Sequence, residues 1–244
     1  MTAKPDFPFY NDRPIPFECR DWLLLMGALA VALAVLTLLP LRHFPQDLVP
    51  ALLFLAIPLL ALRQVAGPHW TAVFRPVGLR EIGLMLLFGL LTLGGSILAA
   101  LILSQFFTLS GNPVAESFDG MTGLSLAARL LPTVPQLIGE ELLGILPFLA
   151  VLWICVTRMG LSRRAGIIAG LLASALVFGA AHLPTYDWNW VQALLGIGFA
   201  RIFLTLAYIA TRNLWVSAGA HVLNDWTGFL VAFTAGHAPI GSDP

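Results

Sequence analysis

The sequence predicts an all-α protein, a polytopic transmembrane helical bundle of about seven spans, with six to eight as the expected range. Of its 244 residues, 58% are hydrophobic and only 11% are charged, whereas soluble domains carry about 25% charged residues. The mean hydropathy is +0.86. So few charged side chains do not cover a water-facing surface of this size, and most of the surface is therefore expected to face lipid.

Seven apolar segments come close to the roughly 20 residues of helix that cross a bilayer. They are Trp22–Leu41, Leu48–Leu62, Ile82–Phe106, Pro135–Val156, Ala165–His182, Trp190–Thr211 and Leu214–Ala235. The second is short and contains Pro50 and Pro58, so it is expected to be tilted, kinked or re-entrant. Leu124–Leu131 is either a short interfacial helix or the start of a long fourth helix kinked near Pro132 and Pro135.

The polar stretches divide the chain into four expected regions. These are a cytoplasmic N-terminal tail (1–21), N-terminal transmembrane helices with a loop (22–124), a helical core (125–235) and a C-terminal tail (236–244). The first apolar segment is as long as a full span, so it is expected to remain as an anchor rather than be cleaved as a signal peptide. Two cysteines, Cys19 and Cys155, are too few for a disulfide framework.

The loop charges predict an orientation, because short loops rich in Lys and Arg remain in the cytoplasm. With seven spans, ten of the 13 cationic residues fall on one side: Lys4, Arg13, Arg20, Arg63, Arg75, Arg80, Arg158, Arg163, Arg164 and Arg212. The opposite loops hold Arg42, Arg129 if it precedes the fourth span, and the acids Asp47, Glu116, Asp119, Asp187 and Asp243. This predicts a cytoplasmic N-terminus. The membrane itself is expected to be a bacterial inner (cell) membrane, which the charges do not determine. The zero net charge gives no indication of a nucleic-acid partner.

Charged groups at membrane depth are costly and mark candidate sites. The first is the pair Glu140–Glu141, in an otherwise apolar segment. Adjacent helical residues point about 100° apart, so one carboxylate is expected to face a site while the other takes a neighbouring partner. Arg201, in the middle of the sixth segment, is expected to pair with one of the two. A buried ion pair without a catalytic role is the alternative interpretation.

Two further polar groups lie in the last spans. Phe178 and His182 are four residues apart and share a helix face, as do His221 and Asp225, with Asn224 on an adjacent face. Taken alone, His182 is more typical of an interfacial histidine than of a catalytic one. The last group alternatively forms a polar seam that joins helices.

In this order and on three of the last four spans, these motifs resemble those of the CPBP family of intramembrane proteases, which includes the CAAX prenyl endopeptidases and relatives in bacteriocin processing and immunity. The family pattern is Glu-Glu-x-x-x-Arg, then Phe-x-x-x-His, then His-x-x-x-Asn/Asp. Glu140–Glu141, Phe178/His182 and His221/Asp225 match it. The resemblance covers about residues 125–235 and is that of a divergent branch, because Ile145 stands where the family has its arginine.

The resemblance implies an intramembrane endopeptidase that hydrolyses a protein substrate near its C-terminal or membrane-anchoring region, whether or not the substrate is prenylated. Glu140 and His182 would activate water, and His221 with Asp225 or Asn224 would face the oxyanion. An ionised Asp225 would repel that oxyanion, so it would be protonated, orient His221, or leave the role to Asn224.

Other interpretations stay open. Glu140, His182, His221 and Asp225 form a possible zinc ligand set, although the His-Glu-x-x-His signature is absent and glutamate catalysis without a cofactor is favoured. A non-catalytic immunity or scaffold protein is favoured by the missing arginine, and a small transporter is a third interpretation. The predicted orientation makes the site open outwards, whereas CAAX proteases act from the cytosolic face.

Overall fold

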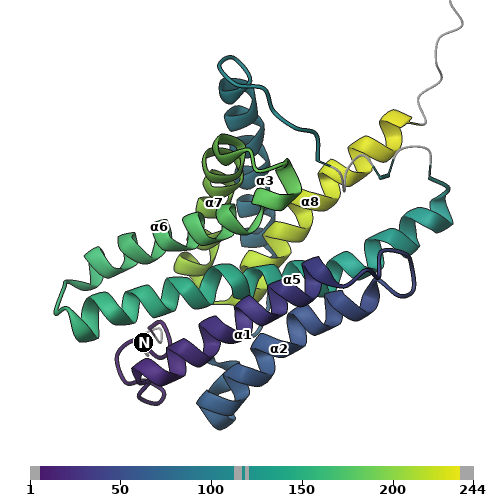
Figure 1. Cartoon of the computed structure of the whole chain (residues 1–244). Coiled ribbons are helices and arrows are strands. Elements are labelled where there is room, and N and C mark those ends of the chain that lie inside the picture. Colours follow the sequence, from purple (N-terminus) through teal and green to yellow (C-terminus); the bar gives the residue numbers. More distant parts are fainter. Residues whose placement is uncertain (1–5, 113–116, 119–120, 237–244) are drawn as a thin grey trace, which may run out of the picture.

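The computed structural model describes residues 6–112, 117–118 and 121–236, and this part of the chain contains seven α-helices and no strand (Figure 1). The helices are α1 (Cys19–Leu38), α2 (Leu48–Ala66), α3 (Leu79–Leu103), α5 (Gly123–Trp153), α6 (Arg163–Ala181), α7 (Gly198–Thr211) and α8 (Leu214–Gly236). Shorter elements are the 3-10 turns Gly67–Val73 and Leu183–Tyr186 and the π-helical turns Ile154–Arg158 and Gln192–Ile197. The predicted all-α bundle is confirmed.

Helix α5 is the central element of the bundle. It packs against α1, α2, α6, α7 and α8, with α1 and α2 on one side and the remaining helices on the other (Figure 1). In its most apolar stretch 83% of the residues are buried, compared with 11% in α3. An apolar residue of α3 therefore mostly faces lipid, whereas an apolar residue of α5 mostly packs against protein.

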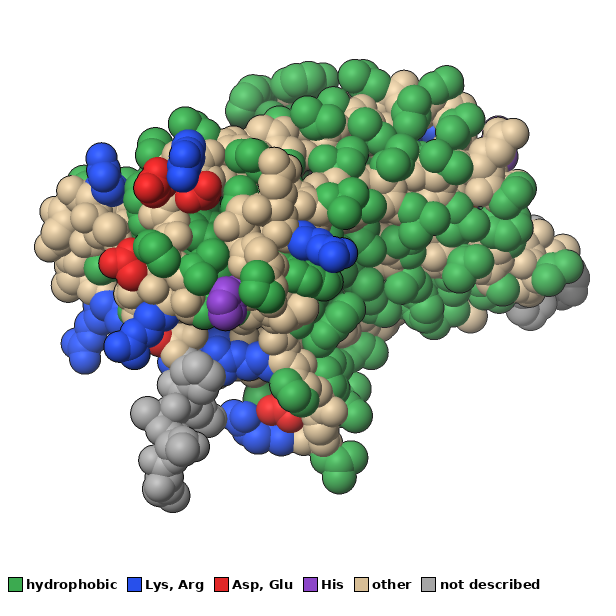
Figure 2. All heavy atoms as spheres, turned by 90° about the horizontal axis from the view of Figure 1, so that it is seen from below, with side chains coloured by type: hydrophobic (Ala, Val, Ile, Leu, Met, Phe, Trp, Pro, Cys, Tyr) green, Lys and Arg blue, Asp and Glu red, His purple; other side chains and the backbone are tan. Residues whose placement is uncertain are grey.

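Within the described ranges, six helices are long and apolar enough to cross a membrane: α1, α2, α3, α5, α6 and α7. Three of them, α2, α5 and α7, are counted together with an adjoining 3-10 or π turn. Helix α8 has 23 residues, but His221, Asn224 and Asp225 lower its hydropathy. It packs along α3, α5 and α7 and corresponds to the seventh predicted span, Leu214–Ala235, but it is not among the six helices that meet both criteria. Figure 2 shows a face covered largely by hydrophobic side chains, with most charged side chains toward one end.

Helices α2 and α5 both continue through internal prolines, which often end or kink a helix. Helix α2 runs without interruption from Leu48 to Ala66, and together with the 3-10 turn that follows it is long and apolar enough to cross a membrane. Pro50 lies in its first turn, where no backbone donor is lost from the hydrogen-bond ladder, and the internal Pro58 is of a kind that membrane helices tolerate. Helix α5 is the long fourth helix, which begins at Gly123 and includes Pro132, Pro135 and Pro147.

The segment before α1 packs into the bundle although its prolines and polar residues predict a tail. Phe7, Phe9 and Phe17 are each less than 5% exposed. The ring of Phe7 lies 5.4 Å from that of Phe148 and 6.0 Å from that of Tyr208. This segment therefore closes the end of the bundle at which α5 and α7 finish.

Candidate active site

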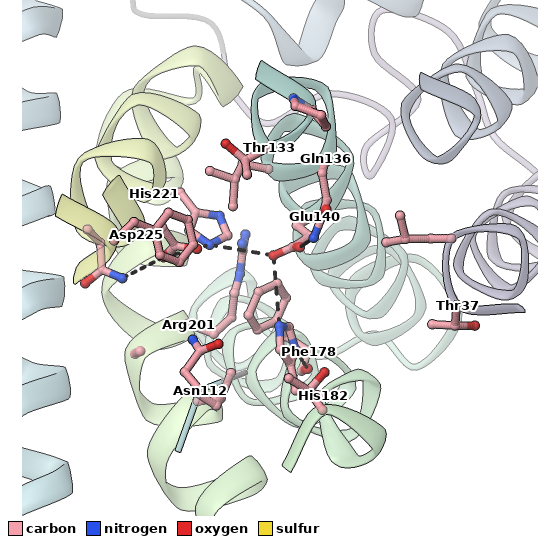
Figure 3. A pocket seen from close by; sticks show the side chains of 18 of the residues that line it. Thr37, Asn112, Thr133, Gln136, Glu140, Phe178, His182, Arg201, His221 and Asp225 are labelled. Atoms are coloured by element: carbon pink, nitrogen blue, oxygen red, sulfur yellow. Dashed lines mark hydrogen bonds and ion pairs between the residues drawn. The ribbon is translucent and has the colours of Figure 1, made fainter. Parts of the chain in front are cut away.

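A cavity of about 520 Å³ lies along one face of α5 and collects all the polar residues singled out in the sequence except Glu141 (Figure 3). Its volume is within the range of small-ligand sites. The polar and aromatic side chains that line it include Thr37, Arg42, Asp47, Arg129, Thr133, Gln136, Glu140, Phe178, His182, Tyr186, Arg201, His221, Asn224 and Asp225. Residues from α1, α5, α6, α7 and α8 thus meet at one place.

Glu140 lies at the centre of this group. Its Oε2 atom is 4.0 Å from Nε2 of His182 and 3.7 Å from Nε2 of His221 (Figure 3). Hydrogen bonds to a water oxygen are about 2.8 Å long, so a single water molecule can contact the carboxylate and an imidazole at these separations. Gln136, one helical turn earlier, donates a hydrogen bond of 2.9 Å from Nε2 to Glu140 Oε1 and fixes the carboxylate.

Glu141 points away from the cavity and binds Arg201. The guanidinium donates two hydrogen bonds, from NH1 to Oε1 at 2.6 Å and from NH2 to Oε2 at 3.1 Å. Both side chains are fully buried. The two adjacent carboxylates therefore divide as predicted, one facing the site and one taking a partner, and Arg201 is confirmed as that partner.

Arg201 occupies space that a side chain at Gly144 would fill. A Cβ atom at Gly144 would collide with the Cζ, Nε and Nη2 atoms of Arg201. The guanidinium also donates from Nε to Thr205 Oγ1 at 3.2 Å and lies over the ring of Phe178. In the family pattern the arginine would stand at position 145 of α5; here a glycine on α5 admits an arginine from α7.

The two histidines are held by their Nδ1 atoms. Nδ1 of His182 lies 2.8 Å from the carbonyl oxygen of Phe178, and Nδ1 of His221 lies 2.9 Å from Oε1 of Glu141. Both acceptors lack a proton to give, so each Nδ1 carries the hydrogen. Both Nε2 atoms consequently face Glu140 and are free to accept or to take up a proton.

Asp225 and Asn224 form a pair at the α8 wall of the cavity. Asn224 Nδ2 donates to Asp225 Oδ1 at 2.8 Å, and the same oxygen lies 3.7 Å from His221 Nε2. Asp225 is thus placed beside His221, and the Asn224 amide is directed at Asp225. This arrangement suits an orienting role for Asp225.

Three residues of the site were missed in the sequence. Gln136 is one turn before Glu140 on the same helix face, and this spacing could have identified it as a neighbour of Glu140. Gly144 gave no signal, because the need for it is set by a side chain on another helix. Tyr186 follows His182 by four residues and lines the cavity. Burial, with the charges of Asp225 and Glu140, raises the pKa of Tyr186 to about 12, so its phenol stays a hydrogen-bond donor.

The separations from Glu140 Oε2 to the two imidazoles are 3.7 and 4.0 Å, somewhat longer than the roughly 3.4 Å between donor atoms around tetrahedral zinc. Within residues 6–112, 117–118 and 121–236, no three His, Cys, Asp or Glu side chains converge closely enough to hold a metal ion.

The cavity ends at loops on the side of the bundle opposite Phe7. Its lining includes Arg42 and Asp47 between α1 and α2, Asn112 after α3, and Thr185 after α6. Asp6, by contrast, contacts Arg163 and Arg212 at the other ends of α6 and α7.

A family model built from known proteins matches part of the chain. The family model described as type II CAAX prenyl endopeptidase Rce1-like matches residues 122–227. This region runs from the residue before α5 into α8 and contains Glu140, His182, His221 and Asp225. No curated protein and no solved structure matches the chain.

Proposed function

Residues 122–227 belong to the CAAX protease-like family, and on that premise we propose that this membrane protein is an intramembrane endopeptidase of the glutamate type. The observation that carries the proposal is the convergence of Glu140 with the Nε2 atoms of His182 and His221, from three separate helices, within 4.0 Å. A protein that only required packing would not direct a carboxylate and two imidazoles at one wet cavity in its membrane core.

The proposed reaction begins with a water molecule held between Glu140 and His182. Glu140 takes a proton from this water as its oxygen attacks the carbonyl carbon of the scissile peptide bond. The resulting oxyanion accepts a hydrogen bond from His221, protonated at Nε2. As the C–N bond breaks, the Glu140 carboxylic acid returns the proton to the leaving amine, which gives one carboxylate product and one amine product.

The residues around the reacting groups hold Glu140 and His221 in place. Gln136 holds one oxygen of Glu140, which leaves Oε2 for the water. Glu141, bound to Arg201, fixes the ring of His221 through Nδ1. We infer that Asp225 orients His221 and that Tyr186 supplies a neutral donor in the cavity wall. In this proposal water activation requires no metal ion.

The substrate is proposed to be a membrane-associated or exported protein, cleaved near its C-terminal or anchoring region. The cavity ends on the side of the bundle opposite the loops that contain most of the arginines. If those loops and the N-terminus are cytoplasmic, the site opens outwards. This orientation differs from that of CAAX proteases that act from the cytosolic face.

The test is processing in cells that lack the gene and are complemented with the wild type or with Glu140→Gln. Loss of a general base lowers a rate by about 10²–10⁴-fold, so one or more membrane proteins should accumulate at their unprocessed mass with Glu140→Gln. The matched control is Glu18→Gln, since that side chain is 68% exposed and distant from the cavity. The variants are compared by mass spectrometry of the membrane fraction.

Two outcomes would reject the proposal. If Glu140→Gln restores processing as well as the wild type, the protein is a scaffold and the carboxylate has no chemical role. If cleavage by purified protein stops with a chelator and returns with zinc, the metal-free mechanism is wrong, although the protease assignment remains.

A further inference from the structure

The 13 cationic residues of the chain fall into three groups. Ten belong to the side of the tail by the predicted topology, and Arg201 is buried beside Glu141. The remaining two, Arg42 and Arg129, break the charge rule that sets the topology. Both line the same cavity, and Arg129 lies eleven residues before Glu140 on α5. Two exceptions that line one cavity call for a common explanation.

Arg42 is available to bind a ligand. Its NH2 group donates to the carbonyl oxygen of Thr37 at 2.6 Å, in the last turn of α1, where a cation is favoured by the helix dipole. A guanidinium has five N–H donors. Within the described ranges no carboxylate lies within 4.0 Å of Arg42, which is an exposed side chain.

Arg129 is only loosely paired. Its NH1 atom lies 3.6 Å from Asp47 Oδ2, which is beyond hydrogen-bond distance. The other oxygen, Oδ1 of Asp47, is buried without a hydrogen-bond partner in the described part of the chain. The Arg129 side chain is 31% exposed, so it can turn toward a better acceptor in the cavity.

The two ends of the cavity therefore carry opposite charge. The inner end has Glu140 and Asp225 in its lining beside His221, which is protonated in the proposed reaction, while Arg201 neutralises Glu141; one net negative charge remains there. The outer end has two arginines and one aspartate. A peptide with a carboxylate at one end would be oriented by this field, with its carboxylate outward and its neighbouring peptide bonds toward Glu140.

We propose that Arg42 and Arg129 form a substrate subsite that takes a carboxylate of the peptide to be cleaved; the inference rests on the proposed function. Arg129 precedes Glu140 by eleven residues on α5, a rise of about 16 Å along the helix axis. An extended peptide covers this distance in about five residues. The carboxylate thus lies at most about five residues from the cleaved bond, and it is either the C-terminal carboxylate or an Asp or Glu side chain.

The experiment measures binding without cleavage. Glu140→Gln protein in zwitterionic nanodiscs is titrated into a short apolar peptide with an N-terminal fluorophore, and anisotropy gives Kd. The peptide is made with a free C-terminal carboxylate, as the C-terminal amide, and as the amide with either one Glu or one Gln near its end. The carboxylate peptides should bind about tenfold more tightly than their neutral counterparts, as charge-assisted hydrogen bonds predict. The amide and Gln forms tell the two carboxylate sources apart.

Three variants in the Glu140→Gln background locate the effect. Arg42→Gln should abolish most of the carboxylate preference, and Arg129→Gln should reduce it. Asp47→Asn should increase it, because a competing carboxylate is removed. Arg20→Gln is the control and should change nothing, since that side chain is 80% exposed at the other end of α1.

The proposal is overturned if carboxylate and neutral peptides bind equally, or if Arg42→Gln leaves the preference intact. It is also overturned if anionic lipid in the nanodiscs removes the preference, which would assign the arginines to lipid head groups. Failure of the proposed function gives a different result, because the carboxylate preference would persist while the wild type cleaved none of these peptides.

Discussion

The protein contains two carboxylate–arginine clusters that share a contact distance and differ in surroundings. In the buried cluster Glu141 binds Arg201 at 2.6 Å, and neither side chain is exposed. In the tail cluster Asp6 binds Arg163, also at 2.6 Å, with 35% and 40% of the two side chains exposed. Because Coulomb attraction depends on the surrounding medium as well as on distance, equal geometry implies unequal consequences of removing a partner.

The comparison also separates two uses of an ion pair. The tail cluster attaches the segment of Phe7 to the ends of α6 and α7, where water and ions weaken each contact. In the buried cluster Glu141 also holds His221. A shift of the ion pair would therefore move the His221 ring in the candidate active site. The buried pair is thus expected to matter for both folding and chemistry, and the exposed pair only slightly for folding.

The largest effect is expected for Arg201→Leu. This change leaves Glu141 as an uncompensated buried charge, which costs about 3–5 kcal/mol of unfolding free energy in comparable pairs. It also frees the ring of His221, so activity should be lost. Thermal unfolding in detergent and the processing assay measure the two effects.

The double variant Arg201→Leu/Glu141→Gln provides the control for charge. It should recover part of the lost stability, because no unpaired charge remains, without recovering activity. An Arg201→Leu protein as stable as the wild type would show that the buried cluster differs little from the exposed one.

A smaller effect is expected for Gly144→Ala, which tests whether the position of Arg201 depends on α5. The added methyl group would collide with the guanidinium, and overpacking of this kind costs about 1–3 kcal/mol. The matched control is Gly94→Ala in α3, where no atom lies within 4 Å of the new Cβ. That control should be neutral or stabilising, because alanine favours helix over glycine. Equal loss of stability in the two variants would contradict a specific role for Gly144.

These residues also show how far the sequence carries the structure. Hydropathy predicted the helices, since lipid exposure is a property of local composition. Helix periodicity predicted that Glu140 and Glu141 have different partners, and the cost of an unpaired charge predicted that Arg201 meets one of them. Gly144 could not be predicted, because its role depends on how α7 lies against α5. The close approach of these two helices is set by tertiary packing, which no local sequence pattern encodes.

The packing of the segment around Phe7 is a second feature that could not be predicted from the sequence. Prolines and polar residues predicted a tail for positions 1–21, and the buried aromatic residues have no helical or strand period to distinguish them. The burial of Phe7 depends on ring contacts with Phe148 and Tyr208, which are distant in the sequence. Arginines from three separate parts of the chain contact Asp6 in this segment. Charge predicted the side of the membrane on which the segment lies but not its packing.

The smallest effect is expected for Asp6→Asn in the tail cluster. Exposed and partly exposed ion pairs contribute about 0–1 kcal/mol, so the loss of unfolding free energy should stay below about 1 kcal/mol and shrink further at high salt. The loss caused by Arg201→Leu should change little with salt, because water and ions do not reach the buried pair. Equal salt dependence of the two variants, measured by thermal unfolding, would contradict the contrast between the clusters.

The contribution of Asp6 should also depend on pH. Burial raises the pKa of this carboxyl, but hydrogen bonds from Arg163, Tyr10 and the backbone N–H of Phe7 outweigh it and lower the pKa from 3.8 to about 2. Because the folded form then binds fewer protons than the unfolded form between these values, the stabilisation is complete above about pH 4 and is lost as the pH falls through 2. The stability difference between the wild type and Asp6→Asn should therefore be constant from pH 7 to about 4 and disappear near pH 2. A difference that grows as the pH falls would mean that the tail is held by the packing of Phe7 and that its ion pair opposes folding.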